Sequence, residues 1–122
     1  MQTNAQITGK SSEQIALCHL SQQGVQLITK NYRCKLGEID LIMRDKINLL
    51  FIEVRSKRAS EYGSGAATIT KNKQRKLILT ASYFLMHHPQ LQALPARFDV
   101  VDIFLEEKSH KLQWIPAAFT AF

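Results

Sequence analysis

The stretch 37–58, GEIDLIMRDKINLLFIEVRSKR, constrains the fold of this chain most. It holds two β-prone segments, 41–44 and 49–54, around a polar loop at 45–48, which is the pattern of a β-hairpin. If Arg44 opposes Leu49, then Ile42 opposes Phe51 and Asp40 opposes Glu53. Side chains alternate between the faces of a strand. One face is therefore expected to be apolar, with Ile39, Leu41, Met43, Leu50, Ile52 and Val54, and the other to carry Glu38, Asp40, Ile42, Phe51, Glu53 and Arg55.

The expected opposition of Asp40 and Glu53 needs a chemical explanation. Directly opposed side chains in an antiparallel pair lie about 4.5 to 5.5 Å apart, and like charges there repel. A shared proton, a basic side chain or a divalent cation such as Mg²⁺ would each relieve the repulsion. The alternative is that both acids are solvated on an exposed face and pair with Arg55 and Lys57.

Charge and composition limit the class of protein. A chain of 122 residues fits one domain, here 1–122 with a frayed segment 1–10. Sixteen Lys and Arg against ten Asp and Glu give a net charge of +6, which favours an anionic partner, nucleic acid before a membrane surface. No GxxxxGK[ST], GxSxG or HExxH motif is present.

Several features favour a cytoplasmic location. No apolar run approaches the roughly 18 residues of a membrane-spanning helix, and the start MQTNAQITGK lacks the apolar core of a secretory signal. Cys18 and Cys34 have no CxxC spacing, so we expect reduced thiols without a chemical role.

A first helix is expected to begin at Ser11 or Ser12 and to end at Gly24. Ala16, Leu17 and Leu20 form its apolar stripe, and Glu13 stands at the head of that stripe. Two interpretations of Glu13 stay open: a first-turn acid favoured by the helix dipole, or a further ligand of a metal held by the hairpin.

Basic residues surround the hairpin on both sides. The segment 25–29 is expected to be a strand, and 30–35, with Arg33 and Tyr32, a basic connection that contacts a nucleic acid backbone and stacks a base, or a solvated strand end. After the hairpin comes a loop at 59–70 that contains Ser64, Gly63 and Gly65 and is long enough to be functional.

Thr70 is expected to cap a helix over 71–87 whose first turns carry Lys71, Lys73, Arg75 and Lys76. Positive charge is unfavourable at a helix N-terminus, and a bound phosphate would compensate for it. The alternative is a solubilising face. His87 and His88 are expected to cap the far end, and His19 and His110 to be structural. Strands are expected at 97–105 and 111–115, followed by an apolar tail that packs on the core or on a second subunit.

Taken in order, the motifs NYR, GEIDLI, FIEVRSKR, TKNKQRK and RFDVV resemble the bacterial YraN family over about residues 10–120. These proteins are similar to archaeal Holliday-junction resolvases in the PD-(D/E)xK nuclease superfamily. The resemblance implies an α/β fold with a restriction-endonuclease-like core, a mixed sheet between helices in the order α-β-β-β-α-β.

The resemblance also implies a set of site residues. Asp40 and Glu53 take the two acidic positions of the motif, Glu13 matches the acid of the first helix, and Arg55 occupies the usual lysine position. Because arginine stays protonated, Arg55 is expected to stabilise charge, and Lys57 or Lys73 to supply the ammonium. Gln74 is expected to orient a phosphate or a water, and the cationic residues that hold nucleic acid are Arg33, Lys57, Arg58, Lys71, Lys73, Arg75 and Lys76.

The implied activity is hydrolysis of phosphodiester bonds with Mg²⁺ or Mn²⁺ held by Asp40, Glu53, the Val54 carbonyl and Glu13. DNA recognised by shape is the expected substrate, and a homodimer is an expected assembly. A nuclease fold that binds DNA or RNA without cutting it is the alternative, favoured by Arg55 in place of lysine. A protein-interaction role through the apolar C-terminal tail is a second alternative.

Overall fold

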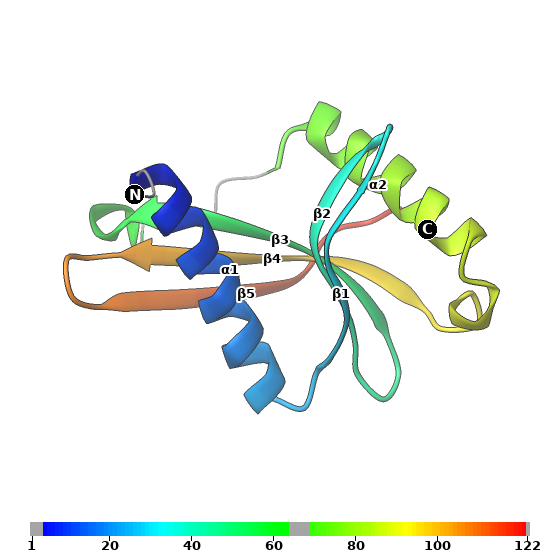
Figure 1. Ribbon diagram of the computed structural model, residues 1–122, viewed down its shortest axis with the longest axis horizontal. Helices are drawn as coiled ribbons and strands as arrows, with labels where there is room; N and C mark the ends of the chain where they lie inside the picture. The colour runs from blue at the N-terminus through cyan, green and yellow to red at the C-terminus, as the bar shows by residue number, and fades with distance from the viewer. Residues whose placement is uncertain (1–3, 64–68, 122) are drawn as a thin grey trace.

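A mixed sheet with two helices makes up the part of the chain that the structure, a computed structural model, describes: residues 4–63 and 69–121 (Figure 1). The elements are α1 (Asn4–Gln22), β1 (Gln26–Cys34), β2 (Gly37–Arg44), β3 (Leu49–Arg58), α2 (Lys71–Met86), β4 (Ala96–Leu105) and β5 (His110–Phe119), with short 3₁₀ helices at Ala59–Glu61 and Pro89–Leu91. This order confirms the expected α/β fold and is consistent with a restriction-endonuclease-like core.

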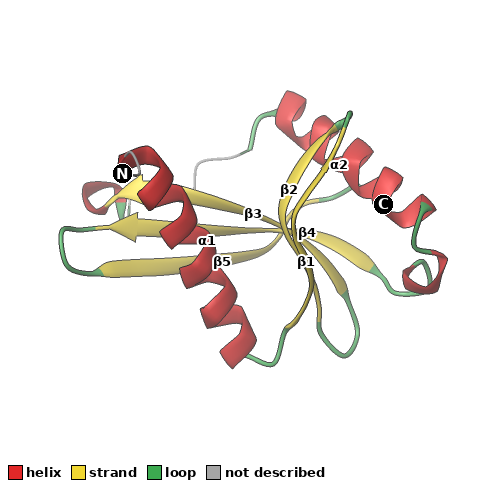
Figure 2. Cartoon of the chain, viewed as in Figure 1, coloured by secondary structure: helices red, strands yellow, loops and turns green. Residues whose placement is uncertain are grey.

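The strand order is β1-β2-β3-β4-β5, so β3 is the central strand (Figure 2). Only the β3–β4 pair is parallel among the described strands, and α2 belongs to the crossover between them. A parallel neighbour needs such a crossover because the chain must return to the same end of the sheet. The second strand of the predicted hairpin, β3, is thus the central strand, paired with β2 on one side and with β4 on the other.

The predicted hairpin register is confirmed from Arg44↔Leu49 to Leu41↔Ile52. The predicted apolar face is wrong at Ile39, which packs in the core cluster beneath α2, whereas Leu41 packs in the cluster beneath α1. Alternation breaks at Asp40 because Asn31, its neighbour on β1, has a left-handed backbone with φ of 54°, and the β1–β2 ladder skips both residues.

The start of the first helix also differs from the prediction. It begins at Asn4, so the segment 4–10, expected to be frayed, is helical, and Ser12 is an interior residue rather than a cap. The Ser12 hydroxyl is buried and lies 2.6 Å from the Ser56 hydroxyl, so it is used for a tertiary contact instead of capping. The predicted end is confirmed, since Gly24 has φ of 88° and its N–H donates to the Ser21 carbonyl.

The basic segment 30–35, expected to connect two strands, belongs to β1 itself, because β1 continues to Cys34. Tyr32 packs edge-on against Phe84 of α2 with ring centroids 5.1 Å apart, which commits its ring to the core instead of to a stacked base. Ser64 and Gly65 of the predicted loop lie outside the described residues. Within the described ranges, no helix is long and apolar enough to cross a membrane.

The ends of α2 follow the prediction. Thr70 caps it by accepting a hydrogen bond from the Lys73 N–H at 3.2 Å. At the other end, Nδ1 of His87 lies 2.8 Å from the Tyr83 carbonyl oxygen and Nδ1 of His88 lies 2.7 Å from that of Phe84. Both imidazoles therefore satisfy carbonyl groups of the last helical turn.

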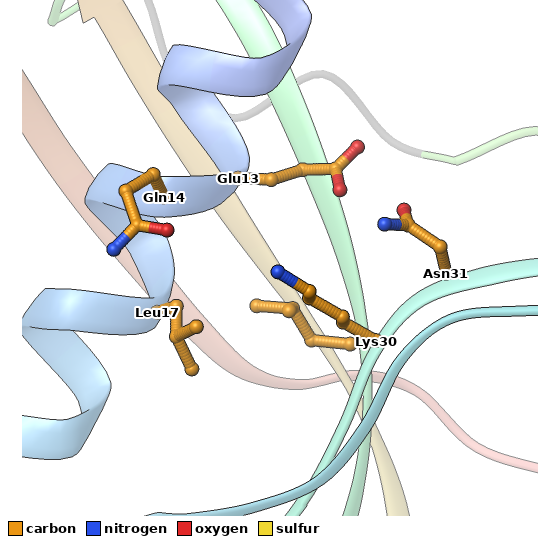
Figure 3. Close-up of a pocket in the computed structure, with 6 residues that line it drawn as sticks. Glu13, Gln14, Leu17, Lys30 and Asn31 are labelled. Atoms are coloured by element: carbon orange, nitrogen blue, oxygen red, sulfur yellow. The ribbon is translucent and has the colours of Figure 1, made fainter.

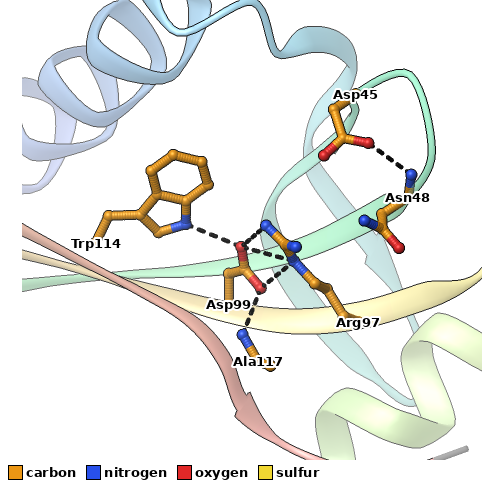
Figure 4. Close-up of polar contacts among 6 residues, drawn as sticks. All are labelled: Asp45, Asn48, Arg97, Asp99, Trp114 and Ala117. Atoms are coloured by element: carbon orange, nitrogen blue, oxygen red, sulfur yellow. Dashed lines mark hydrogen bonds and ion pairs between the residues drawn. The ribbon is translucent and has the colours of Figure 1, made fainter.

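The apolar tail packs on the core of its own chain. Phe119, at the end of β5, stacks on Phe98 of β4 with ring centroids 4.7 Å apart. Asp99 of β4 fixes β5 in place, because it accepts hydrogen bonds from the Trp114 indole and the Ala117 backbone N–H, both 2.9 Å long (Figure 4). The tail therefore closes the core beneath α2.

Candidate functional site

Asp40 lies where β2 and β3 separate. The ladder between these strands ends at Leu41↔Ile52, while β3 continues beside β4 to Arg58↔Leu105. The predicted backbone pairing of Asp40 with Glu53 is therefore wrong. The Asp40 carboxylate instead accepts the backbone N–H of Val54 through Oδ2 at 2.8 Å. This bond fixes one carboxylate oxygen at the point of divergence, beside the side chain of Glu53.

Asp40 has an unusual electrostatic environment. The pKa of its carboxyl is raised from 3.8 to about 7, first by burial and then by the hydrogen bond to Glu53 and the charge of Glu53. The Val54 N–H opposes this rise, and Glu38 adds to it. The predicted repulsion between Asp40 and Glu53 is thus present at the level of the side chains, and a proton on Asp40 relieves it near neutral pH.

Glu53 contacts the first turn of α2. Lys73 Nζ lies 3.2 Å from Glu53 Oε2, and the Glu53 side chain is only 14% exposed. This oxygen is shut off from solvent and has no hydrogen bond of acceptable geometry within the described residues. A buried carboxylate oxygen without hydrogen bonds is costly, so the site can accept a further cation at this atom.

Arg55, the residue at the usual lysine position, is held by a partner that the sequence did not reveal. Its Nε and one terminal nitrogen donate to the two carboxylate oxygens of Asp102 at 2.7 and 3.0 Å. Asp102 is its neighbour in the parallel β3–β4 ladder and is fully buried. The one signal for it was an acid inside the apolar run VVDIF, since a buried charge requires a partner.

A cavity beside these groups joins β3 to the start of α2. It is lined by Glu53, Arg55, Ile69, Thr70 and Lys73. An acid, two cations and a helix N-terminus therefore face one space. Gln74, expected to orient a phosphate or a water, donates its side-chain amide to the Ile69 carbonyl at 2.8 Å. Gln74 thus stabilises the segment 69–70, which leads into α2 and lines this cavity.

Glu13 lies on the other side of Asp40, in a cleft between α1 and the β1–β2 hairpin (Figure 3). Burial raises the pKa of its carboxyl, as do the charges of Asp40 and Glu38, while Asn31 and Lys30 act in the opposite direction. The carboxylate points toward Asn31 in this view. Glu13 is thus close enough to Asp40 to be affected by its charge, but it enters a separate cleft.

The predicted nucleic acid contacts fall into groups. Lys71, Arg75 and Lys76 are exposed on the first turns of α2, near Lys73. Lys57 and Arg58 line a separate depression with Ser56, Glu61 and Leu105 at the end of β3. Arg33, at the β1–β2 turn, pairs with Glu38 at 3.2 Å and lines a shallow pocket with Lys76. The α2 group is the one that adjoins the carboxylate pair.

The carboxylate pair has the chemistry to bind a divalent cation. No group of three His, Cys, Asp or Glu side chains in the described ranges is placed to hold a metal ion, so Glu13 is not part of such a cluster. Mg²⁺ commonly takes only one or two carboxylates together with waters and phosphate oxygens. The buried, unbonded Oε2 of Glu53 and the raised pKa of Asp40 fit a site of that kind.

Comparisons with known proteins identify the family. Residues 12–103 match the model of the uncharacterised protein family UPF0102. A UPF0102 protein of Legionella pneumophila strain Corby is 44% identical, over 93% of this chain and 94% of that protein. A UPF0102 protein of Saccharophagus degradans is also 44% identical, over 93% and 92% of the two chains.

A third relative, a UPF0102 protein of Xanthomonas oryzae pv. oryzae strain PXO99A, is 46% identical over 93% of this chain and 91% of that protein. These names state no activity. The relatives and the family model agree with the resemblance carried by the GEIDLI and FIEV motifs. The chain belongs to the UPF0102 family, which is the YraN family.

Proposed function

We propose that this protein is a metal-dependent endonuclease that hydrolyses phosphodiester bonds in structured DNA. The observation that carries the proposal is the pair Asp40 and Glu53, two adjacent carboxylates at the divergence of β2 and β3, beside a cavity that also holds Arg55 and Lys73. Such a pair beside cations suits a divalent ion on one side and a phosphate on the other.

In the proposed reaction, a water oxygen forms a bond to phosphorus, the bond from phosphorus to the leaving sugar oxygen breaks, and that oxygen gains a proton. A bound Mg²⁺ or Mn²⁺ would supply Lewis acidity and an activated water. Asp40 and Glu53 would hold it, with Asp40 oriented by the Val54 N–H. Arg55 and Lys73 would offset negative charge that develops on the phosphate. Asp40 must lose its proton first, so activity should rise toward and above pH 7.

Binding of DNA would depend on its backbone. The exposed cations on the first turns of α2 can contact phosphates near the carboxylate pair, and Arg33, Lys57 and Arg58 can extend the contact. Phosphate contacts position a duplex without reading its sequence, which favours recognition by shape. Affinity for DNA should therefore fall steeply as salt is raised. A flat salt response would argue against any nucleic acid function.

The decisive experiment is a cleavage screen of four-way junctions, flaps, nicked and linear duplexes with Mg²⁺ or Mn²⁺. We expect cleavage of at least one branched DNA by the wild type and none by Asp40→Asn or Glu53→Gln. Lys108→Gln is a matched control, because Lys108 is exposed in the β4–β5 turn, remote in sequence from the proposed site. Equal activity in the Glu53→Gln protein would contradict the proposal.

A second function, binding without cleavage, is favoured by the Arg55–Asp102 pair. This pair places a half-buried arginine, hydrogen-bonded to a buried carboxylate, where a lysine is expected. If the wild type cuts none of the substrates but binds branched DNA with a steep salt dependence, the protein is a binding module. Calorimetry with Mn²⁺ separates the two cases, since only the nuclease requires metal binding that is lost in Asp40→Ala.

A further inference from the structure

Lys73 is distinguished from the other cations of α2 by its contact with the carboxylate pair. Its Nζ lies 3.2 Å from Glu53 Oε2, although the lysine side chain is 49% exposed. Lys71, on the same turn, and Lys76 are exposed, and Arg75 donates to the Asn72 side chain. Lys73, a half-exposed cation, therefore contacts the carboxylate oxygen that has no hydrogen bond among the described residues.

We propose that Lys73 is an internal counter-ion that competes with the divalent cation for Glu53, and that metal binding releases Lys73 into the adjoining cavity. The inference rests on the proposed function, because it concerns the same carboxylate pair. In the absence of metal, Lys73 balances the charge of Glu53. Once a metal is bound, Lys73 becomes available to a phosphate.

Two structural facts assign this role to Lys73 rather than to Arg55. Arg55 is bound to Asp102 by two short hydrogen bonds and is only 21% exposed, so it cannot leave without exposing a buried carboxylate. Within the described ranges, Lys73 makes one ion pair, at the end of a long, flexible side chain that is 49% exposed. Moving it costs little.

Competition follows from charge and space. An ammonium that lies 3.2 Å from an oxygen occupies one of the positions from which a cation can bind that atom. Mg²⁺ binds carboxylate oxygens at about 2.0 to 2.1 Å, so both cations on one oxygen would repel each other at close range. The cavity that Lys73 lines also contains Arg55 and Thr70, and it is open to an anion. The displaced ammonium can remain there.

The test is calorimetric titration of the full chain with Mn²⁺ alone, at about pH 8 so that Asp40 is ionised. Lys73→Gln should bind Mn²⁺ about two- to fivefold more tightly than the wild type, the range expected from removal of one partly exposed ion pair. Lys73→Arg keeps the competing charge and should show no gain. Lys71→Gln removes the same charge from the same turn without touching Glu53, and it should match the wild type.

The outcomes separate the two proposals. Mn²⁺ binding that is lost in Glu53→Gln but is equal or weaker in Lys73→Gln overturns the role of Lys73 and leaves the metal site standing. A wild type and a Lys73→Gln protein that both give no heat with Mn²⁺ overturn the metal site and this inference together. Lys73→Met, which retains the aliphatic stem, repeats the measurement if Lys73→Gln is poorly folded by circular dichroism, and it should also bind Mn²⁺ more tightly.

Discussion

Two acidic centres of the sheet, Asp99 and the Asp40–Glu53 pair, differ in how fully their oxygens are hydrogen-bonded. Asp99 in β4 accepts hydrogen bonds from Arg97 at 3.0 Å, from the Trp114 indole and from the Ala117 N–H (Figure 4). Asp40 in β2 accepts the Val54 N–H, and its other neighbour is a second carboxylate, Glu53. Both centres are buried or partly buried, but among the described residues N–H donors reach both oxygens of Asp99 and one oxygen of Asp40.

This difference separates a structural acid from a candidate functional one. Asp99 lies where the β4–β5 ladder is irregular between Phe98 and Val100, and its bonds replace the missing ladder bonds. Ala117, with φ of 49°, is held in its left-handed backbone by one of them. The Asp40–Glu53 pair also lies at an irregularity, the left-handed Asn31, but it retains a carboxylate oxygen without a hydrogen bond among the described residues. Like charges that are kept together at a cost in stability make this pair, rather than Asp99, the candidate for binding or catalysis.

The largest expected effect is on catalysis. Glu53→Gln should lower the rate of cleavage of a branched DNA at least about 1,000-fold, or about 4 kcal/mol, because it removes the carboxylate charge needed for the metal. Asp99→Asn should change that rate by less than about threefold, since its amide oxygen still accepts hydrogen bonds and residue 99 does not line the cavity beside Glu53. Single-turnover cleavage below the unfolding temperature of both variants measures this. Comparable losses of cleavage rate in the two variants would contradict the division into a structural acid, Asp99, and a functional one, Glu53.

The two arginine–aspartate pairs provide the next effect. Arg55→Ala should lower the free energy of unfolding by about 3 to 5 kcal/mol, because Arg55 supplies all the hydrogen bonds to Asp102 among the described residues. Arg97→Ala should cost only about 1 to 2 kcal/mol, since Asp99 keeps the Trp114 and Ala117 donors.

Urea unfolding of the two variants and the wild type measures this difference. Arg55→Leu combined with Asp102→Leu should recover most of the loss, because no unpaired charge remains in the sheet. If Arg97→Ala proves as destabilising as Arg55→Ala, the remaining donors do not compensate Asp99 as the geometry indicates.

The pH dependence of stability provides a third and smaller effect. The pKa of Asp40 is about 7 in the folded protein and near 3.8 when unfolded, so between these values the folded state binds more protons. The contribution of Asp40 to the free energy of unfolding should therefore be highest at the acidic end and fall by roughly 2 to 4 kcal/mol as pH rises from 4 to 7, while Asp45, whose pKa is lowered, acts in the opposite direction. Glu13, whose pKa is also raised, acts in the same direction as Asp40.

Asp40→Asn isolates this contribution, because it removes the titrating group and keeps an acceptor for the Val54 N–H. The wild type minus Asp40→Asn difference, from urea unfolding across a pH series, should show the whole decline. Parallel profiles for the two proteins would mean that burial and Glu53 do not raise the pKa of the Asp40 carboxyl.

Local features of the sequence predicted much of the fold. The four-residue loop and the alternation of apolar side chains fixed the β2–β3 register, and Thr70 and Gly24 marked helix ends through well-known capping chemistry. The closeness of Asp40 to Glu53 followed from that register. These features depend on neighbours within a few residues or across one turn, where the spacing in the sequence alone determines which residues come into contact.

Features that depend on distant partners were not predictable in this way. The Arg55–Asp102 pair joins residues 47 apart, and the Ser12–Ser56 contact joins residues 44 apart. Both require the parallel register or the position of α1, which no local pattern encodes. The divergence at Asp40 depends on the left-handed backbone of Asn31, and a non-glycine residue gives little warning of that conformation.

The smallest expected change in the free energy of unfolding tests whether the three hydrogen-bond donors to Asp99 act independently. Trp114→Phe removes the indole N–H but keeps an aromatic ring in the cluster beneath α1. Asp99 retains Arg97 and the Ala117 N–H, so the free energy of unfolding should fall by only about 1 kcal/mol, the value of one hydrogen bond. Thermal and urea unfolding measure it. A loss of several kcal/mol would mean that the three donors act as one cooperative network, in which case the satisfied centre is as sensitive to a single deletion as the unsatisfied one.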